Sequence, residues 1–263
     1  MIQVYKQIKY LIFDLDGTLL NSQNEISPET LKMVRNMRDM YTIIIASGRH
    51  YEDIKQYVRQ LDLKDNVQII CCDGQYIVDY EGAVIWEATF LNRNDLLYFC
   101  RKNPGKKIYY YTALHDYEIV YGLKGVLKIL LYNLRNKRFR YRSERTISVN
   151  EKIEKIAIMD LQNSEECLNK YTINHLASGR SEILPLNVNK FNALSQIIEK
   201  DEMDSVLYFG DDANDIECFK NFKYSVSMGN ALEEIKEKAY YVTESNDNDG
   251  VKKVLEWMLK GEI

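Results

Sequence analysis

The sequence lacks the features that mark membrane-spanning, secreted or disulfide-bonded proteins. No run approaches the ~20 apolar residues that a spanning helix needs. The five cysteines form no CxxC pair, and an odd number would leave one unpaired in a secreted protein. The first twenty residues are broken by lysines and aspartates and carry no small-residue cleavage site. We therefore expect a cytoplasmic protein whose thiols are reduced.

The chain also has no excess of positive charge and none of several catalytic motifs. It carries 35 Lys and Arg against 39 Asp and Glu, a net charge of -4, whereas a dedicated nucleic-acid binder is usually basic. The patterns GxSxG, GxxxxGKS/T, GxGxxG and HExxH do not occur. Esterase, P-loop, dinucleotide-binding and zincin functions therefore lack support, and we expect neither a nucleic acid nor a membrane as partner.

The apolar residues that are present predict an α/β fold. The chain has 263 residues, which is enough for one or two domains at about 150 residues each. Hydrophobic residues make up 46% of it. Short continuous apolar runs are typical of strands buried in a parallel sheet, and they occur at 10–13, 42–46, 67–70 and 205–209. Helical patterns alternate with them at 27–38, 190–200, 213–221 and 231–238, and a further strand is predicted at 224–228. Both ends of the chain thus predict one Rossmann-like sheet.

The middle of the chain has a different pattern. From Tyr76 the residues alternate as in a β-hairpin that turns at Glu81-Gly82, and further strand-like stretches follow at 108–120, 138–149 and 155–161. We interpret residues 86–182 as an inserted α+β domain, entered and left near residues 85 and 183. Residues 1–85 and 183–263 would then form the core.

Polar residues follow the predicted parallel strands at the point where each strand ends. In an open α/β sheet these ends meet at one rim, where ligands bind. Several carboxylates at one rim repel each other unless a cation neutralises them. A site with few protein ligands, all of them oxygen atoms, favours Mg²⁺. A lysine, a hydroxyl and helix N-termini beside a metal suit a phosphoryl group. The residues concerned are Asp14, Asp16, Ser47, Gly48, Lys190, Asp211, Asp212, Asn214 and Asp215.

On these residues the chain resembles the haloacid dehalogenase (HAD) superfamily of phosphohydrolases, and within it the Cof-type branch with a type-IIB cap. The family motif DxDxT matches Asp14 to Thr18, the second motif matches Ser47, the third Lys190, and the fourth Gly210 to Asp215. Asp73-Gly74 resembles the usual Asn-Gly step, with Asp for Asn. Phe191 stands where a small residue is frequent. The resemblance covers the whole chain and is weakest in the cap.

The resemblance implies a role for each matched residue. Asp14 would be the nucleophile that forms an aspartyl phosphate, and Asp16 the general acid and base. Mg²⁺ would be held by Asp14, by Asp211 and by the backbone carbonyl of Asp16, with Asp215 behind it orienting ligands or the lysine. Ser47, Gly48, Lys190 and Asn214 would bind the phosphoryl oxygens. Asp212 lies at a variable position and receives no role.

The inserted domain would select the substrate, as the resemblance implies for such caps. The tyrosines at 109–111, 117 and 121 are expected either to stack on a sugar or a ring or to fill the core of the cap. Alternation places Arg138, Arg140 and Arg142 on one strand face, either as readers of a second anionic group or as a solvated face with its aromatics inward.

Three functions compete on this pattern. The first is a Mg²⁺-dependent phosphatase of small phosphorylated metabolites such as sugar phosphates. The second is a phosphotransferase or mutase that uses the same aspartyl phosphate. The third is a non-catalytic sensor of a phosphorylated ligand. The presence of both Asp14 and Asp16 argues against a sensor, because binding alone needs no acid–base carboxylate.

Overall fold

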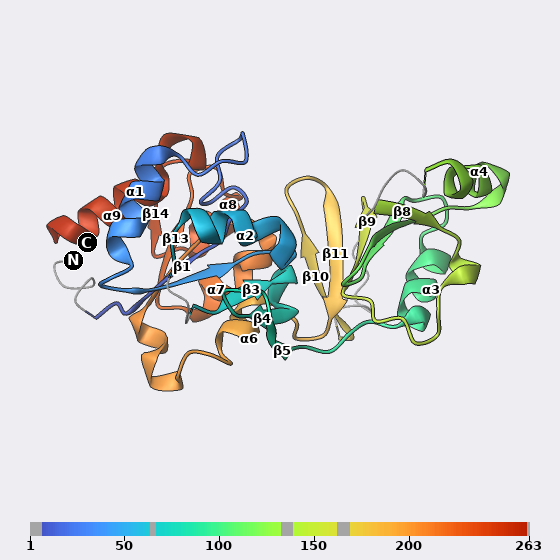
Figure 1. Cartoon of the computed structure of the whole chain (residues 1–263), viewed down its shortest axis with the longest axis horizontal. Coiled ribbons are helices and arrows are strands. Elements are labelled where there is room, and N and C mark those ends of the chain that lie inside the picture. Colours follow the sequence, from blue (N-terminus) through green and yellow to red (C-terminus); the bar gives the residue numbers. More distant parts are fainter. Residues whose placement is uncertain (1–6, 64–66, 133–138, 162–168, 262–263) are drawn as a thin grey trace. The chain divides into compact units, whose positions relative to one another are not determined.

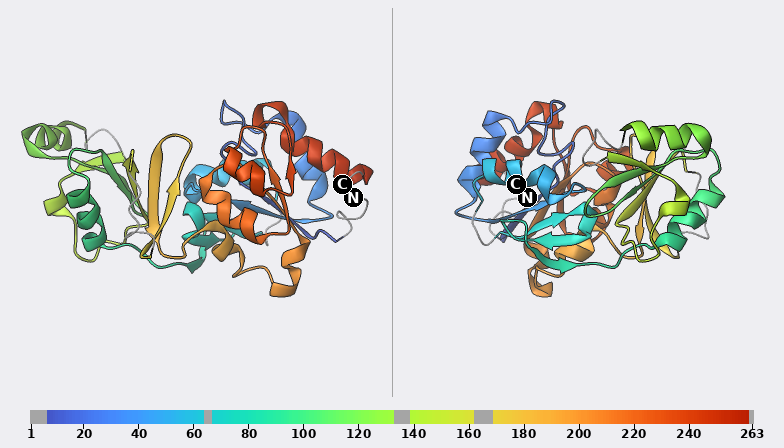
Figure 2. Two further views of the ribbon diagram at one scale, coloured as in Figure 1. Left: turned by 180° about the vertical axis from the view of Figure 1, so that it is seen from behind. Right: turned by 45° about the vertical axis from the view of Figure 1, so that its right-hand side comes forward.

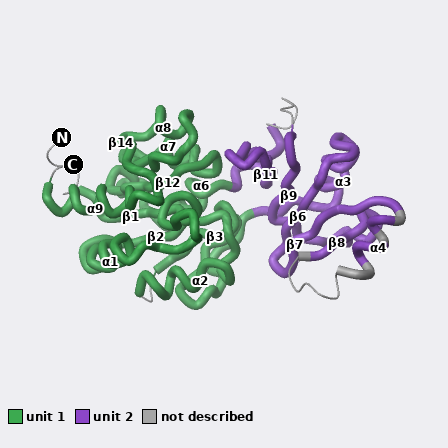
Figure 3. The backbone as a smooth tube through the Cα atoms, turned by 90° about the horizontal axis from the view of Figure 1, so that it is seen from above, with its two compact units in different colours: residues 1–88, 189–263 green, residues 89–188 purple. Residues whose placement is uncertain are grey.

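The protein is described by a computed structural model that covers residues 7–63, 67–132, 139–161 and 169–261. Arg138 lies outside these described residues. The chain divides into two compact units, one of residues 1–88 and 189–263 and one of residues 89–188 (Figure 3). The predicted insertion at 86–182 begins three residues and ends six residues before the second unit, to which the strand Arg180–Pro185 belongs by its pairing. In the described part of the chain, no helix has the length and apolarity needed to cross a membrane.

The first unit is built on an eight-stranded sheet. Its strands are β1 (Tyr10–Phe13), β2 (Thr42–Ala46), β3 (Ile69–Cys71), β4 (Tyr76–Val78), β5 (Val84–Glu87), β12 (Val206–Gly210), β13 (Tyr224–Ser227) and β14 (Tyr241–Val242). Their order is β14-β13-β12-β1-β2-β3-β4-β5, parallel from β14 to β3 and antiparallel for β4 and β5 (Figure 1). The chain therefore forms the predicted parallel sheet, with the predicted hairpin at its edge.

Helices cover both faces of this sheet, as can be followed in Figures 1 and 2. The helices α1 (Pro28–Met37), α2 (Tyr51–Gln60) and α9 (Gly250–Lys260) pack on one face, and α6 (Lys190–Leu194), α7 (Ile216–Asn221) and α8 (Glu233–Lys238) on the other. Short 3₁₀ turns lie at Cys72–Gly74, Lys200–Ser205, Ala213–Asp215 and Asn246–Asn248. Parallel strands covered on both faces are buried throughout, which explains their continuous apolar runs.

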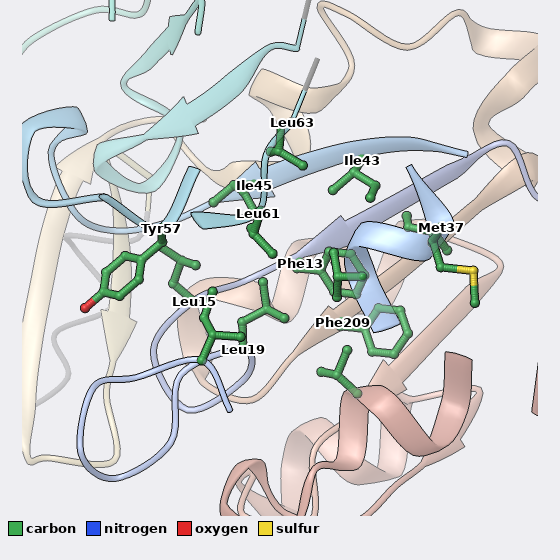
Figure 4. Packing of buried hydrophobic residues seen from close by; sticks show 14 of the residues in the cluster. Phe13, Leu15, Leu19, Met37, Ile43, Ile45, Tyr57, Leu61, Leu63 and Phe209 are labelled. Atoms are coloured by element: carbon green, nitrogen blue, oxygen red, sulfur yellow. The ribbon is translucent and has the colours of Figure 1, made fainter. Parts of the chain in front are cut away.

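Successive residues of each central strand belong to opposite cores. Leu11 and Phe13 of β1 belong to the cluster under α1, α2 and α9, whereas Ile12 belongs to the cluster under α6 to α8. Phe13 stacks on Phe209 of β12, with ring centroids 4.9 Å apart (Figure 4). This packing fixes the two central strands side by side, and the site residues follow directly from their ends.

Local sequence signals explain where the elements begin and end. The Ser27 hydroxyl accepts a hydrogen bond from the backbone N–H of Thr30 and caps α1, as predicted. The predicted helix at 190–200 is wrong beyond residue 194. There the Ser195 hydroxyl donates to the Asn192 carbonyl, and the chain continues in turns until the 3₁₀ segment that begins at Lys200.

The second unit contains a six-stranded sheet with helices α3 (Arg93–Lys102) and α4 (Gly122–Tyr132) and a 3₁₀ turn at Glu144–Thr146. Its strands are β6 (Ile108–Tyr111), β7 (Asp116–Ile119), β8 (Phe139–Arg142), β9 (Lys155–Met159), β10 (Tyr171–His175) and β11 (Arg180–Pro185). They lie in the order β10-β11-β9-β6-β7-β8, antiparallel except for the pair β7 and β8. One core lies between α3 and one face of this sheet.

Candidate active site

Asp14 occupies the first position after β1, where the centre of the sheet places it. Its backbone N–H donates to the Phe209 carbonyl at 3.0 Å, which continues the pairing of β1 with β12. Its side chain is buried, and Oδ1 accepts a hydrogen bond from Lys190 Nζ at 2.6 Å. A carboxylate in this position is fixed by the backbone behind it and by a cation beside it.

Lys190 is a buried cation that joins two carboxylates. It lies at the first position of α6, behind the capping side chain of Asn189, and is 0% exposed. Its ammonium donates to Asp14 Oδ1 and to Asp215 Oδ1, both at 2.6 Å. Burial opposes the charge, but the neighbouring carboxylates outweigh it and hold the pKa of Lys190 well above its usual value. The lysine therefore stays protonated.

Asp215 uses both of its carboxylate oxygens in hydrogen bonds. Oδ1 accepts from Lys190 and from the Tyr208 hydroxyl at 2.5 Å, and Oδ2 accepts from the backbone N–H groups of Asp211 at 2.9 Å and Asp212 at 3.2 Å. A carboxylate that already accepts four hydrogen bonds has few lone pairs left to bind a metal ion. Its contacts instead orient Lys190 and the backbone of Asp211.

The carboxylates around Asp211 fit a hard divalent cation. Ligand oxygens of Asp14, Asp211 and Asp215 lie within 4.8 Å of one another. Burial and the neighbouring carboxylates raise the pKa of Asp14 to about 8 and that of Asp211 to about 9. Oδ1 of Asp211 is buried and has no hydrogen-bond partner among the described residues. An oxygen-only donor set with this excess of negative charge is the chemistry that Mg²⁺ prefers.

Gly17 lets the first loop approach Asp211. It adopts φ +76°, and an added Cβ would lie 2.0 Å from Asp211 Oδ2. That same oxygen accepts a hydrogen bond from Asn230 Nδ2 at 3.1 Å, and Asn230 also donates to the Gly17 carbonyl at 2.9 Å. The glycine is thus required both by backbone conformation and by space.

We expect Gly17→Ala to weaken metal binding. The methyl group would displace the Asp211 carboxylate, so the Mg²⁺ concentration for half-maximal activity should rise about tenfold or more, the usual cost of disturbing groups around a metal ligand. Titration of activity with Mg²⁺ measures this shift. Gly105→Ala is the matched control, because Gly105 also has positive φ but no atoms lie within 4 Å of its added Cβ. Equal Mg²⁺ requirements in the two variants would contradict the assignment of Asp211 as a metal ligand.

The second strand end supplies donors beside the carboxylates. Ser47 follows β2, is 0% exposed, and donates its backbone N–H to the Ile70 carbonyl at 2.9 Å. Gly48 packs against Asp73, since an added Cβ would lie 2.7 Å from Asp73 Oδ1. Asn214 donates from Nδ2 to the same oxygen at 2.8 Å. The ends of β2, β3 and β12 therefore meet here, and the sequence predicts this meeting for β2 and β12.

Asp16 is held in an ion pair with Arg49. Arg49 Nε donates to Asp16 Oδ2 at 2.8 Å, and its Nη2 donates to Oδ1. Arg49 also donates to Asn24 Oδ1 at 3.0 Å and lies over the Tyr57 ring. A bidentate pair with planar guanidinium geometry fixes the orientation of a carboxylate. For Asp16 to transfer a proton, at least one of its oxygens must leave this pair.

Sequence reasoning missed three residues of this site, namely Arg49, Tyr208 and Asn230. Arg49 and Asn230 follow β2 and β13, so the strand-end rule that selected Ser47 also applies to them. Tyr208 has no comparable signal, because a tyrosine inside an apolar strand looks like any core residue. Only the fold shows that its hydroxyl reaches Asp215.

The arginines of β8 do not form a solvated face in the second unit. Arg140 and Arg142 pair in register with Tyr117 and Ile119, on the face that carries the core. Arg142 donates to Glu151 at 2.5 Å and to the Tyr110 hydroxyl at 3.0 Å, and it lies over the Tyr117 ring. The prediction of an exposed arginine face with inward aromatics is therefore wrong for Arg142.

The tyrosines of the second unit divide between the two faces of its sheet. Tyr110 is fully buried and stacks on Tyr117 with centroids 4.7 Å apart, so these two fill the core. Tyr109 and Tyr111 alternate with Tyr110 along β6 and lie on the opposite face. Tyr121 is 50% exposed. The core-filling alternative therefore holds for Tyr110 and Tyr117, and stacking on a sugar or a ring stays a prediction for Tyr109, Tyr111 and Tyr121.

Comparisons with known proteins agree with this geometry. A family model described as haloacid dehalogenase-like hydrolase matches residues 11–255. The 5-amino-6-(5-phospho-D-ribitylamino)uracil phosphatase YcsE of Bacillus subtilis is 26% identical and is matched over 96% of each chain. The solved structure of SMU.1108c from Streptococcus mutans has a TM-score of 0.77 at 23% identity and covers 96% of this chain and 99% of that chain. The HAD subclass IIB sugar phosphatase BT4131 gives 0.75 at 22% identity, covering 97% of this chain and 100% of its own.

Proposed function

Because the chain belongs to the haloacid dehalogenase-like hydrolase family, we propose that it hydrolyses small phosphorylated metabolites with Mg²⁺, through an aspartyl phosphate on Asp14. The chain is a phosphatase of the Cof-type branch, since its relatives are named phosphatases. One observation carries the proposed mechanism: the buried Asp14 accepts a hydrogen bond from Lys190 and has an oxygen within 4.8 Å of one from Asp211, whose Oδ1 has no hydrogen-bond partner among the described residues.

Asp14 would act as the nucleophile. Its carboxylate oxygen attacks phosphorus, a new oxygen–phosphorus bond forms, and the bond to the leaving oxygen breaks. In the second half, a water molecule attacks the same phosphorus and the bond to Asp14 breaks, which releases inorganic phosphate. The contact with Lys190 keeps Asp14 oriented and offsets the charge that develops on the phosphoryl oxygens.

Asp16 would move the protons of both steps. It gives a proton to the leaving oxygen and then removes one from the attacking water, so the carboxyl group returns to its initial state. Arg49 holds the carboxylate in place between these transfers. The exposed position of Asp16 allows it to reach a leaving group that lies outside the buried part of the site.

The remaining residues would bind the phosphoryl group and the metal ion. Ser47, the Gly48 amide, Asn214 and Lys190 would donate to the phosphoryl oxygens. Mg²⁺, when bound by Asp14, Asp211 and the backbone carbonyl of Asp16, would neutralise the negative charge of the site and of the phosphate. Asp215 would keep the ligand backbone and the lysine in place.

We assign the choice of leaving group to the inserted unit, because the core motifs contact only the phosphoryl group and the metal. The proposed candidate on β8 is Arg140, because Arg142 is engaged within the unit by Glu151, Tyr110 and Tyr117. Sugar phosphates are the first substrate class to test, and a phosphoribitylamino pyrimidine is the second, since YcsE is named for such a substrate.

Arg142→Ala is expected to lower stability more than specificity. It removes an ion pair with Glu151, a hydrogen bond to Tyr110 and stacking on Tyr117, a loss of about 1.5–3 kcal/mol in the free energy of unfolding. Urea denaturation measures this loss, and kcat/KM ratios between substrates should hardly change. Arg140→Ala is the matched variant on the same strand. If Arg140→Ala alters the kcat/KM ratio between a sugar phosphate and an aryl phosphate, that arginine reads the leaving group.

The proposed function is tested by phosphate release. Purified protein with Mg²⁺ should liberate inorganic phosphate from 4-nitrophenyl phosphate in water, with no acceptor alcohol present. A panel of phosphorylated metabolites should then show higher kcat/KM for a subset of sugar phosphates. Absence of phosphate release from every compound, by protein that is folded and loaded with Mg²⁺, would contradict the proposal. Release of 4-nitrophenol that requires an added acceptor alcohol, with the phosphoryl group recovered on that alcohol and not as inorganic phosphate, would indicate a phosphotransferase instead.

A further inference from the structure

A buried carboxylate, Asp73, lies among the residues that would bind the phosphoryl group. It follows β3 and is 1% exposed. The roles proposed above for Ser47, Gly48, Asn214 and Lys190 leave Asp73 without a function. A negative charge beside a phosphate site raises the free energy of the bound anion, so its position calls for an explanation.

The backbone holds Asp73 firmly in this place. Cys72 and Asp73 both adopt positive φ, 52° and 57°, which non-glycine residues seldom do. The Asp73 N–H donates to the Ser47 carbonyl at 3.1 Å. The next residue, Gly74, packs on the start of α6, since an added Cβ would lie 2.2 Å from the Asn189 carbonyl oxygen. A strained turn that is fixed from two sides is typical of a functional position.

Asp73 contacts three of the four proposed phosphoryl ligands, Ser47, Gly48 and Asn214, and its charge acts on the fourth, Lys190. Its Oδ1 accepts from Asn214 Nδ2 at 2.8 Å, which orients that amide. The same oxygen packs against Gly48, where no side chain would fit. The Asp73 charge also helps to raise the pKa of Lys190. The carboxylate is thus within reach of the anion that these ligands would surround.

We propose that Asp73 is a positioning residue that orients Asn214 and, through its negative charge, weakens the binding of product phosphate. The inference rests on the proposed phosphoryl site. Inorganic phosphate and a phosphate monoester both carry between one and two negative charges at neutral pH, so a nearby carboxylate repels both of them and opposes retention of the product. Release of product is often the slow step of an efficient enzyme, and a repulsive group at the site would speed it.

Asp73→Asn separates charge from shape. The amide is nearly isosteric, and its oxygen can still accept from Asn214, but the negative charge is gone. The dissociation constant of inorganic phosphate, measured by isothermal titration calorimetry on the Mg²⁺-loaded protein, should fall about tenfold or more, the scale of removing a like charge at a few ångströms. KM should fall with it, while kcat stays the same or decreases because phosphate leaves more slowly.

Two further variants complete the test. Asp73→Ser also lacks the charge but keeps a hydroxyl acceptor, and it answers the question if Asp73→Asn does not fold. Glu29→Gln removes one exposed charge from the first turn of α1 and should leave phosphate binding unchanged. Unchanged or weaker phosphate binding in both folded Asp73 variants would overturn the inference. If neither the wild type nor any variant binds phosphate, the proposed phosphoryl site itself is wrong.

Discussion

Asp14→Asn should abolish turnover while the protein stays folded. The amide has the shape of the carboxylate but no negative charge, so it cannot attack phosphorus. We expect kcat to fall more than about 100-fold, equivalent to ~2.7 kcal/mol of lost barrier lowering. The Lys190 ammonium keeps its second partner, Asp215, so the buried cation is not left unpaired. Steady-state kinetics and thermal unfolding of the variant measure the two expectations.

Asp212→Asn is the matched control for this experiment. Asp212 lies at the same rim and carries the same charge, but its side chain caps Ala213 through a hydrogen bond of 2.7 Å, which an asparagine can replace. It should retain most of the activity. A variant at position 14 that keeps more than about 1% of wild-type kcat would rule out covalent catalysis by Asp14.

Removal of Mg²⁺ is the second change with a large expected effect. The carboxylates of Asp14 and Asp211 are buried with raised pKa values and need a cation to lie side by side in ionised form. Exhaustive chelation should therefore lower activity by at least about 100-fold, since a bound metal supplies several kcal/mol of charge stabilisation. Mg²⁺ should restore it. Ca²⁺ should oppose it, because Ca²⁺ prefers more ligands at longer distances.

The same carboxylates predict how the stability of the chelated protein depends on pH. Their folded pKa values, about 8 and about 9, lie above the ordinary value of 3.8, so the native state binds more protons than the unfolded state between these limits. This contribution to the free energy of unfolding therefore decreases as pH rises from about 4 toward 8. Mg²⁺ should raise the thermal midpoint at pH 8, and Asp211→Asn should lose that increase. Full activity after chelation, together with no Mg²⁺-dependent stabilisation, would show that the cluster binds no metal.

Much of the fold follows from the sequence because its physical signals are local. A strand buried on both faces must be apolar throughout, so the runs at 10–13 and 42–46 could be identified directly. The start of α1 is likewise predicted by Ser27, which caps the helix, and by Pro28 at its first position. The end of α6 was mispredicted, since turns beyond Leu194 depend on which backbone groups Ser195 and its neighbours find in the folded chain.

The residues that directly follow parallel strands could be predicted from the sequence. Contacts between side chains of different loops could not. Strand ends share a rim, so the sequence alone places Asp14 and Asp211 together. The ion pair of Asp16 with Arg49 joins two loops whose side-chain directions no sequence pattern gives. The alternation rule correctly grouped Arg140 with Arg142, but which face carries the core depends on the packing of α3.

Asp16→Asn should allow the aspartyl phosphate on Asp14 to accumulate. With 4-nitrophenyl phosphate the leaving group needs little proton donation, so the first step should proceed, whereas the water of the second step lacks its base. Acid-quenched protein analysed by mass spectrometry should then carry one added phosphoryl group on the peptide that contains Asp14. A phosphoryl group on another residue, or steady phosphate release with none on the protein, would contradict the account.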